Sequence, residues 1–325
     1  MKITIAGCFD LHDGYLGAAN ALRRKGVEVD FVPAHRYCHE NPSGDTRVDL
    51  VVKDLQDQKP DVILWWRAEG FNGRQFQDIR RRVDGKFAMY SWDDPYQWEK
   101  HPEMPAKCKV LDVSFSCCMD SVKDYKKHGC ESFYCPPGFD PSIHYPEKSE
   151  EHKSDVSLIC TNLYSGNITK YPHVVRAGLL NALKNQGEGL DVRLYGTDNF
   201  KDIYPEFYKG WMPFAESRKV FHNSKISLCT HIRADGDMYI NERVCQVLGS
   251  QGLLLVDGVK NMKDAIGDTF ILMDLNTNNS FVDQIRDIVL NYDKYEEIKK
   301  SGYEFAIKNL TWDNWAETIL GNIGE

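Results

Sequence analysis

The chain has 325 residues, of which 42% are hydrophobic, 12% aromatic and 27% charged, and its formal net charge is −8. This balance excludes a disordered chain and a chain built to cross membranes. The acidic excess also argues against binding nucleic acid over the whole surface, although it leaves a local basic cleft open. At roughly 100–200 residues per domain, the length predicts two domains or one large one.

Nothing near the start of the sequence resembles a secretory signal, because only a very short apolar stretch precedes Gly7 and Asp10. The longest apolar runs, 62–66 and 253–256, have the length of strands and fall far short of the ~20 residues that span a membrane. The ten cysteines include no C-x-x-C pair and no zinc-ligand spacing. We therefore expect a cytoplasmic protein with reduced thiols and no membrane span, and we assign no residue to a metal.

The first half of the chain alternates between strand and helix patterns. The predicted strands cover 2–6, 27–32, 61–66, 87–92, 113–116 and 132–135, and the predicted helices cover 15–25, 48–58 and 73–83. The run 61–66 is almost continuously apolar, as expected of a strand covered on both faces. This alternation predicts a parallel sheet with helices on both sides.

A polar passage then interrupts the alternation, with four prolines at 136, 137, 141 and 146 and a charged run at 148–153, and it predicts an interdomain linker. Beyond it the pattern resumes. The predicted strands cover 155–160, 191–195, 225–229, 253–256 and 270–273, and the predicted helices cover 174–184, 215–222, 241–248, 281–292 and 294–310. The chain is therefore predicted to form two α/β lobes of similar size.

Two α/β lobes that face a cleft bind ligands at the carboxyl ends of their strands, so the residues after each strand are the first candidates. His12 and Asp13 follow the first strand in a loop with glycines, and they are candidates for contact with substrate. The alternative is that Asp13 caps the next helix and the glycines form a turn. The loop lacks the G-x-G-x-x-G pattern, which argues against a dinucleotide-dependent dehydrogenase.

Asp93 and Asp94 end the strand at 87–92, and a carboxylate in that position suits a general base. The neighbouring Trp92, Tyr96 and Trp98 suggest a surface on which a sugar stacks. The alternative is an ordinary Asp-Pro turn.

Thr161 and Asn162 follow the first strand of the second lobe, and Lys170 and Arg176 come shortly after, at or inside the next helix. Small polar residues, a glycine and two cations at a helix start suggest a cradle for a diphosphate. The alternative is a pair of solvated surface cations.

Trp211 and Met212 offer an aromatic wall for a nucleotide base, or else belong to an ordinary apolar loop. Arg243 and Gln246 are three residues apart at a helix start and so share one face, which suits a phosphate contact and a ribose contact. Arg233 is the remaining cation proposed for the donor site. It is followed by Asp-x-Asp at 235–237, which we interpret as a turn and not as a metal site.

Several ordered segments of the second half are similar to one known group of proteins. They are PPGFDP at 136–141, DVS at 155–157, KISL at 225–228, RVCQVLGSQGLLL at 243–255 and LTW at 310–312. On these segments the chain resembles the group 1 glycosyltransferases of the GT-B fold, and most closely the CgeB-type spore-maturation glycosyltransferase-like family. It shows a fainter similarity to phage DNA β-glucosyltransferases.

The resemblance implies two Rossmann-like lobes facing a cleft, with the C-terminal helix crossing back to the first lobe. Residues 1–148, with about 308–325, would bind the acceptor, and residues 149–307 would bind the nucleotide sugar. It implies that Arg176 and Arg243 contact the diphosphate and that Asp93, beside Asp94, is the general base. Gln246 stands where the family has a carboxylate that binds the ribose hydroxyls.

The implied activity is transfer of a sugar from a nucleotide-diphosphate sugar to a hydroxyl acceptor, which is a small molecule, a glycan or a modified DNA base. The donor is a substrate, no further cofactor is required, and metal dependence, stereochemistry and oligomeric state stay open. Gln246 favours one rival, a non-catalytic nucleotide- or sugar-binding protein. The phage similarity and the basic residues Arg74, Arg80, Arg81 and Arg82 favour another, a DNA-base glycosyltransferase.

Overall fold

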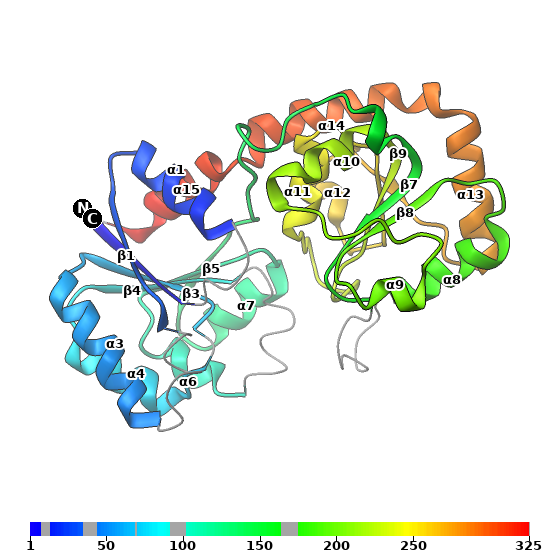
Figure 1. Ribbon diagram of the computed structural model, residues 1–325. Helices are drawn as coiled ribbons and strands as arrows, with labels where there is room; N and C mark the ends of the chain where they lie inside the picture. The colour runs from blue at the N-terminus through cyan, green and yellow to red at the C-terminus, as the bar shows by residue number, and fades with distance from the viewer. Residues whose placement is uncertain (8–13, 35–43, 69, 92–101, 164–174, 325) are drawn as a thin grey trace. The chain divides into compact units, whose positions relative to one another are not determined.

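The computed structural model describes residues 1–7, 14–34, 44–68, 70–91, 102–163 and 175–324. Contacts divide the chain into two compact units, one of Met1–Gly138 with Trp312–Glu325 and the other of Phe139–Thr311. Each unit holds one parallel sheet with helices packed against it (Figure 1). The prediction of two parallel-sheet α/β lobes is therefore confirmed.

The sheet of the first unit has six strands in the order β2-β1-β3-β4-β5-β6. Its strands are β1 (Lys2–Gly7), β2 (Glu28–Val32), β3 (Val62–Trp66), β4 (Lys86–Ser91), β5 (Val113–Ser116) and β6 (Glu131–Tyr134). The helices of this unit are α1 (Gly14–Arg24), α3 (Gly44–Gln58), α4 (Gly73–Arg82), α6 (Met104–Cys108), α7 (Met119–Lys127) and α15 (Trp312–Ile323). All strand pairs in the described residues are parallel.

The central strand β3 is apolar along its whole length because helices cover both faces of the sheet. Leu64 and Trp66 pack into the cluster that includes α1 and α15, whereas Ile63 and Trp65 pack into the cluster that includes α3 and α4. Successive residues of a strand point to opposite faces, so this alternation places the two helical layers on opposite sides (Figure 1).

Helix α15 returns to the first unit, as expected, and packs beside α1 (Figure 1). The ring centroids of Trp315 and Trp66 are 5.8 Å apart. A Cβ atom on Gly17 of α1 would lie 2.5 Å from the Trp312 ring, so only glycine permits this close approach. Arg24 of α1 also pairs with Asp313 at 2.9 Å.

The sheet of the second unit has five strands in the order β11-β10-β9-β7-β8. Its strands are β7 (Ser154–Ile159), β8 (Val192–Tyr195), β9 (Ser224–Cys229), β10 (Leu254–Val256) and β11 (Ile271–Leu272). Its α-helices are α8 (Arg176–Gln186), α9 (Phe200–Ile203), α10 (Ser217–Asn223), α11 (Glu242–Gly249), α12 (Met262–Ile266), α13 (Asn278–Leu290) and α14 (Glu296–Asn309).

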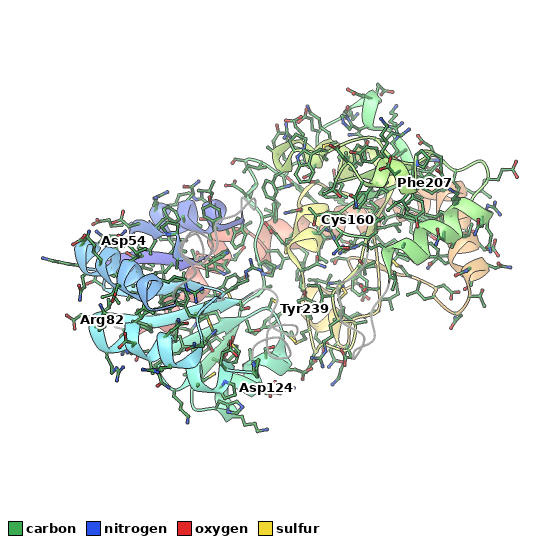
Figure 2. The ribbon with its side chains drawn as sticks, turned by 60° about the horizontal axis from the view of Figure 1, so that its bottom comes forward. Asp54, Arg82, Asp124, Cys160, Phe207 and Tyr239 are labelled. Carbon is green, nitrogen blue, oxygen red and sulfur yellow. The ribbon has the colours of Figure 1, made fainter. Side chains whose placement is uncertain are left out.

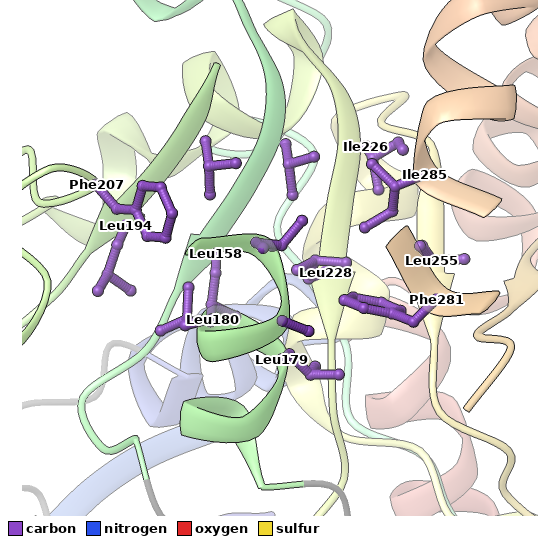
Figure 3. Close-up of a cluster of buried hydrophobic side chains, with 14 of the residues drawn as sticks. Leu158, Leu179, Leu180, Leu194, Phe207, Ile226, Leu228, Leu255, Phe281 and Ile285 are labelled. Atoms are coloured by element: carbon purple, nitrogen blue, oxygen red, sulfur yellow. The ribbon is translucent and has the colours of Figure 1, made fainter. Parts of the chain in front are cut away.

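One face of this second sheet is covered by α8 and α13, and the core between them is almost entirely aliphatic and aromatic (Figure 3). Leu179 of α8 and Phe281 and Ile285 of α13 pack with Leu158 of β7 and Leu228 of β9. The apolar residues of these helices recur at helical intervals, so each helix presents one apolar face to the sheet.

Strand β7 lies between β8 and β9, so the chain leaves β7 toward one side of the sheet and crosses to the other side after β8. The carboxyl ends of β7 and β9 therefore flank a point where the strand order reverses. Parallel α/β sheets bind their ligands at such a point, because the two flanking loops diverge and leave room there. The carboxyl ends of β1 and β3 have the same relation in the first sheet.

None of the helices in the described residues is both long and apolar enough to cross a membrane.

Candidate functional site

Arg176 spans the reversal point of the second sheet. It is the first residue of α8, its Nε atom donates to Thr230 Oγ1 at 2.9 Å, and its Nη1 atom donates to the Asn162 carbonyl oxygen at 2.6 Å. Asn162 follows β7 and Thr230 follows β9. The structure thus brings together Arg176 and Asn162, two of the residues predicted for the donor site.

The start of α11 lies against the same point. Asn241 is the N-cap of this helix, accepting from the Val244 backbone N–H, and its Nδ2 atom donates to the Thr230 carbonyl oxygen at 3.1 Å. This contact fixes the loop after β9 to the positive end of the α11 dipole. Arg243 and Gln246 are half-buried residues of the same helix.

Arg176 and Arg243 are close enough to repel each other. Burial lowers the pKa of the Arg176 guanidinium, and the positive charge of Arg243 lowers it further. Within the described part of the chain, neither guanidinium has a carboxylate at ion-pair distance, and Arg243 has no side-chain hydrogen bond. Two adjacent cations that have no carboxylate at ion-pair distance among the described residues are suited to binding an anion, since a bound phosphate would offset both charges.

A buried His–Asp pair lies at the same edge of the sheet. His231 follows β9 and Asp257 follows β10, and both side chains have no solvent exposure. The backbone N–H of His231 donates to Asp257 Oδ2 at 2.7 Å, and its Nδ1 atom lies 2.6 Å from Oδ1. The ring of Tyr239, labelled in Figure 2, packs edge-on against the imidazole with centroids 5.2 Å apart.

Neither member of this pair is among the residues predicted from the sequence. Asp257 directly follows the predicted strand 253–256, a position where polar residues are candidates for ligand contact. His231 comes two residues after the predicted strand 225–229. Their mutual contact depends on β9 and β10 being neighbours, which no local pattern reveals.

Arg233, unlike Arg176 and Arg243, has a carboxylate at ion-pair distance among the described residues. Its Nε atom donates to Asp235 Oδ1 at 2.5 Å, so its charge already has a partner. Asp237 accepts from Asn261 Nδ2 at 2.8 Å. Both carboxylates of the Asp-x-Asp segment therefore make local contacts, and no group of three or more metal-ligating side chains occurs among the residues that the structure describes.

Trp211 lies near the carboxyl end of β8, the neighbour of β7. The Gly196 N–H, just after β8, donates to the Gly210 carbonyl oxygen at 3.0 Å, and Trp211 follows with 57% of its surface exposed. Such exposure of a large aromatic side chain is consistent with a surface for stacking. Met212 is half-buried and Thr161 is exposed, and the described contacts tie neither to the arginines.

Five predicted site residues lie outside the described residues: His12, Asp13, Asp93, Asp94 and Lys170. The strands that lead to the first four are described, with β1 ending at Gly7 and β4 at Ser91. Their proposed roles stay predictions.

The basic segment of α4 is occupied by local ion pairs. Arg80 pairs with Asp112 at 3.2 Å, and both Arg81 and Arg82 pair with Asp78. Figure 2 labels Arg82 on this helix. The segment is therefore less available to a DNA backbone than its sequence suggested.

A family model described as glycosyl transferase-like matches residues 176–321, a segment that begins at Arg176. No curated protein matches the chain. Solved structures match over nearly the whole length, among them sucrose-phosphate synthase from Thermosynechococcus elongatus, with a TM-score of 0.73, 10% identity, and coverage of 99% of this chain and 98% of that chain.

Anabaena HepE in complex with UDP matches with a TM-score of 0.66, 10% identity and coverage of 99% of both chains. An α-glucosyltransferase in complex with UDP and a 13-mer DNA matches with a TM-score of 0.60, 12% identity, and coverage of 100% of this chain and 99% of that chain. At such identities the likeness establishes the fold alone. The two-lobed architecture is that of GT-B glycosyltransferases, as the sequence resemblance implied.

Proposed function

We propose that this protein transfers a sugar from a nucleoside diphosphate sugar to a hydroxyl group of an acceptor. The observation that carries the proposal is the pair Arg176 and Arg243. They are adjacent cations at the reversal point of the second sheet, and neither has a carboxylate at ion-pair distance among the described residues. This point lies in the part of the chain where the glycosyl transferase-like match begins. HepE was also solved with UDP-glucose, which supports a nucleotide sugar as donor.

In the proposed reaction, the acceptor oxygen attacks the anomeric carbon while the bond from that carbon to the diphosphate oxygen breaks. The electron pair of that bond leaves with the diphosphate, and Arg176 and Arg243 stabilise the developing charge. The acceptor proton passes to a carboxylate, for which we propose Asp93 with Asp94 as its neighbour. If the enzyme retains the anomeric configuration, Asp93 instead orients the acceptor.

The other predicted residues receive matching roles. Trp211 and Met212 would contact the base, and Gln246 would bond a ribose hydroxyl. Lys170 and Arg233 would add positive charge near the diphosphate, Thr161 and Asn162 would line its cradle, and His12 and Asp13 would lie near the acceptor.

We further propose that the second lobe binds the donor and the first lobe binds the acceptor, in a CgeB-type enzyme that works in the cytoplasm. The eight described cysteines support a reducing compartment, because all are buried free thiols.

Transfer to a DNA base is a second candidate, since one structural neighbour was solved with DNA. The ion pairs of Arg80, Arg81 and Arg82 disfavour it. Binding to duplex DNA at low salt, with transfer to it, would establish this acceptor class, and absence of binding would exclude it.

The proposal is tested first by ligand binding. UDP, ADP, GDP, CDP and dTDP, and the corresponding glucose donors, are screened by thermal unfolding, and at least one should raise the melting temperature by mass action. Failure of every nucleotide would contradict the proposal. Binding without donor hydrolysis or transfer over hours would favour the non-catalytic rival.

The catalytic assignment is tested with Asp93→Asn. We expect the turnover rate to fall about 10²–10⁴-fold with little change in donor affinity, because the variant keeps the size of the side chain but cannot accept the proton. Asp57→Asn, at an exposed position on α3, is the control and should keep the wild-type rate. A near wild-type rate for Asp93→Asn would remove Asp93 from the role of base.

A further inference from the structure

The buried His–Asp pair contains one ring nitrogen that none of the described contacts involves. His231 Nε2 is shielded from solvent and has no hydrogen-bond partner among the described residues. Buried polar atoms are nearly always bonded, because an unbonded one forfeits the hydrogen bonds that it made to water. A buried ring nitrogen without a hydrogen bond is therefore unusual, and this one lies beside a candidate ligand site.

The orientation of the ring is fixed from one side. Nδ1 donates to Asp257, whose carboxylate takes its side-chain and backbone hydrogen bonds from His231 alone among the described residues. The two nitrogens of an imidazole point in divergent directions, so Nε2 faces away from Asp257. The edge-on contact with Tyr239 further restricts rotation of the ring.

The surroundings of the ring are cationic. The neighbouring residue Thr230 accepts from Arg176, and its carbonyl oxygen accepts from Asn241, the cap of α11. Arg243 lies in the first turn of that helix. Two unpaired guanidinium groups and a helix N-terminus all attract negative charge to this place.

The imidazole of His231 can supply one more hydrogen-bond donor beside Arg176, Arg243 and the start of α11. A carboxylate as deeply buried as Asp257 is stabilised by a positive partner, and a bound anion beyond Nε2 adds a second negative group. A proton on Nε2 would let the ring donate to the anion while Nδ1 still bonds Asp257. Nε2–H is then a charge-assisted donor.

We propose that His231 Nε2 donates a hydrogen bond to a phosphate oxygen of the bound nucleoside diphosphate, and that Asp257 acts as the positioning residue that holds the ring. This inference rests on the proposed function, because it takes a diphosphate as the ligand. Since solvent does not reach Nε2, the diphosphate must displace the atoms that cover it, so the contact forms as the ligand binds.

The test compares His231→Asn with His222→Asn. An asparagine amide can replace Nδ1 as a donor to Asp257, but it has no atom at the place of Nε2. His222 is the matched control, because it is half-buried in the same unit and bonds the Ser250 carbonyl oxygen through its own Nδ1. Calorimetry then gives the affinities of UDP, inorganic pyrophosphate, UDP-glucose and uridine for each protein.

We expect His231→Asn to bind UDP, pyrophosphate and UDP-glucose about ten-fold more weakly, as fits the loss of one charge-assisted hydrogen bond, while uridine binds as before. His222→Asn should bind all four like the wild type. Equal affinities for the wild type and His231→Asn would overturn the proposal, and so would an equal loss for UDP and uridine, which indicates a structural role. A loss for UDP-glucose alone would assign Nε2 to a sugar hydroxyl and also overturn it.

Nitrogen NMR of ring-labelled histidine in the wild-type chain provides a second measurement that does not depend on a variant folding. Addition of UDP should give a protonated, slowly exchanging Nε2 resonance for His231, and no change in that resonance would overturn the proposal. If the wild type binds no nucleoside diphosphate, both this inference and the proposed function fail. If it binds UDP and only the His231 results are negative, the proposed function survives and the inference fails.

Discussion

At the scale of single residues, the arginines differ in whether a carboxylate pairs with them. Arg218 has a carboxylate partner in Glu147 at 2.6 Å, and Arg193 has one in Asp191 at 2.9 Å. Among the residues that the structure describes, Arg176 donates only to neutral oxygen atoms, and the pKa of its guanidinium is lowered by burial and by Arg243. Such an arrangement costs stability in the free protein and favours anion binding.

We predict that Arg176→Met weakens nucleoside diphosphate binding by about ten-fold or more, because one charge-assisted contact is lost from a partly desolvated site. The measurement is calorimetric titration with the nucleotide found in the thermal screen. Arg286→Met on α13 is the control, since Arg286 donates to the Gln186 and Glu188 carbonyl oxygens, away from the site. An unchanged affinity for Arg176→Met would remove this residue from the anion site.

His144 shows a different use of a buried imidazole, one that makes stability depend on pH. Its Nε2 atom donates to Ser217 Oγ, which in turn donates to the Phe214 carbonyl oxygen. Burial, with a smaller contribution from the charge of Arg218, lowers the pKa of His144 from 6.5 to about 3. The folded chain therefore keeps this ring neutral at a pH where the unfolded chain protonates it.

We predict that this histidine stabilises the fold fully above about pH 6.5 and that its contribution falls as the pH drops toward 3, by about 1.4 kcal/mol per unit. Urea unfolding of the wild type and of His144→Gln, measured from about pH 7.5 to about pH 4.5, gives the slope of the free energy of unfolding against pH for each protein. The variant should lose stability less steeply. Parallel slopes for wild type and His144→Gln would contradict the assignment.

At the scale of elements, close approaches between helices depend on particular glycines. Gly17 of α1 lies against the Trp312 ring of α15, where an added Cβ atom would lie 2.5 Å from two ring atoms. Gly178 of α8 is exposed, and no atom lies within 4 Å of its would-be Cβ. Both glycines are helical, so the same substitution separates the effect of packing from that of helix propensity.

We predict that Gly17→Ala destabilises the first unit by about 1–3 kcal/mol through overpacking, whereas Gly178→Ala stabilises its helix by about 0.5–1 kcal/mol. Urea unfolding of both variants gives the comparison. Equal effects of the two substitutions would show that α1 and α15 can separate without cost.

Sequence patterns were sufficient to locate some strands but not the short helices. Strands β1, β3 and β7 were located to within one or two residues, because each contains apolar or β-branched residues in a run of strand length. Helices α6 and α7 were missed, since five and nine residues are too few for a helical period to stand out. The two-residue β11 was predicted as four residues, because Phe270 and Met273 on either side of it are also apolar.

At the scale of the whole molecule, the last helix completes a unit that begins more than 300 residues earlier. Trp312 and Trp315 pack against Trp66, and Trp315 also packs against Tyr90. The first unit thus has an aromatic core made from both ends of the chain. Lys25 and Glu317 add an ion pair between the same two helices at 2.5 Å.

We predict that a chain ending after Thr311 cannot fold its first unit stably, because the hydrophobic cluster around Trp66 becomes exposed. The amides of the second unit should keep their protection from hydrogen exchange. Hydrogen exchange of the two units gives the measurement. A chain that ends after Ile323 keeps both tryptophans and is the control. Native protection of β1 and β3 in the shorter chain would contradict the role assigned to α15.

The sequence by itself determined the two α/β lobes, the return of the last helix and most of the arginines considered for the donor site. It did so because strand and helix periods are local properties, and because the resemblance followed segments in order. Only the tertiary structure decided which charged groups meet. Arg176 reaches Thr230 because β7 and β9 are neighbours, and His231 reaches Asp257 because β9 and β10 are. Strand order depends on how the whole core packs, and no local pattern reveals it. Although the net charge of the chain is −8, this order places the cations Arg176 and Arg243 together at one edge of the second sheet.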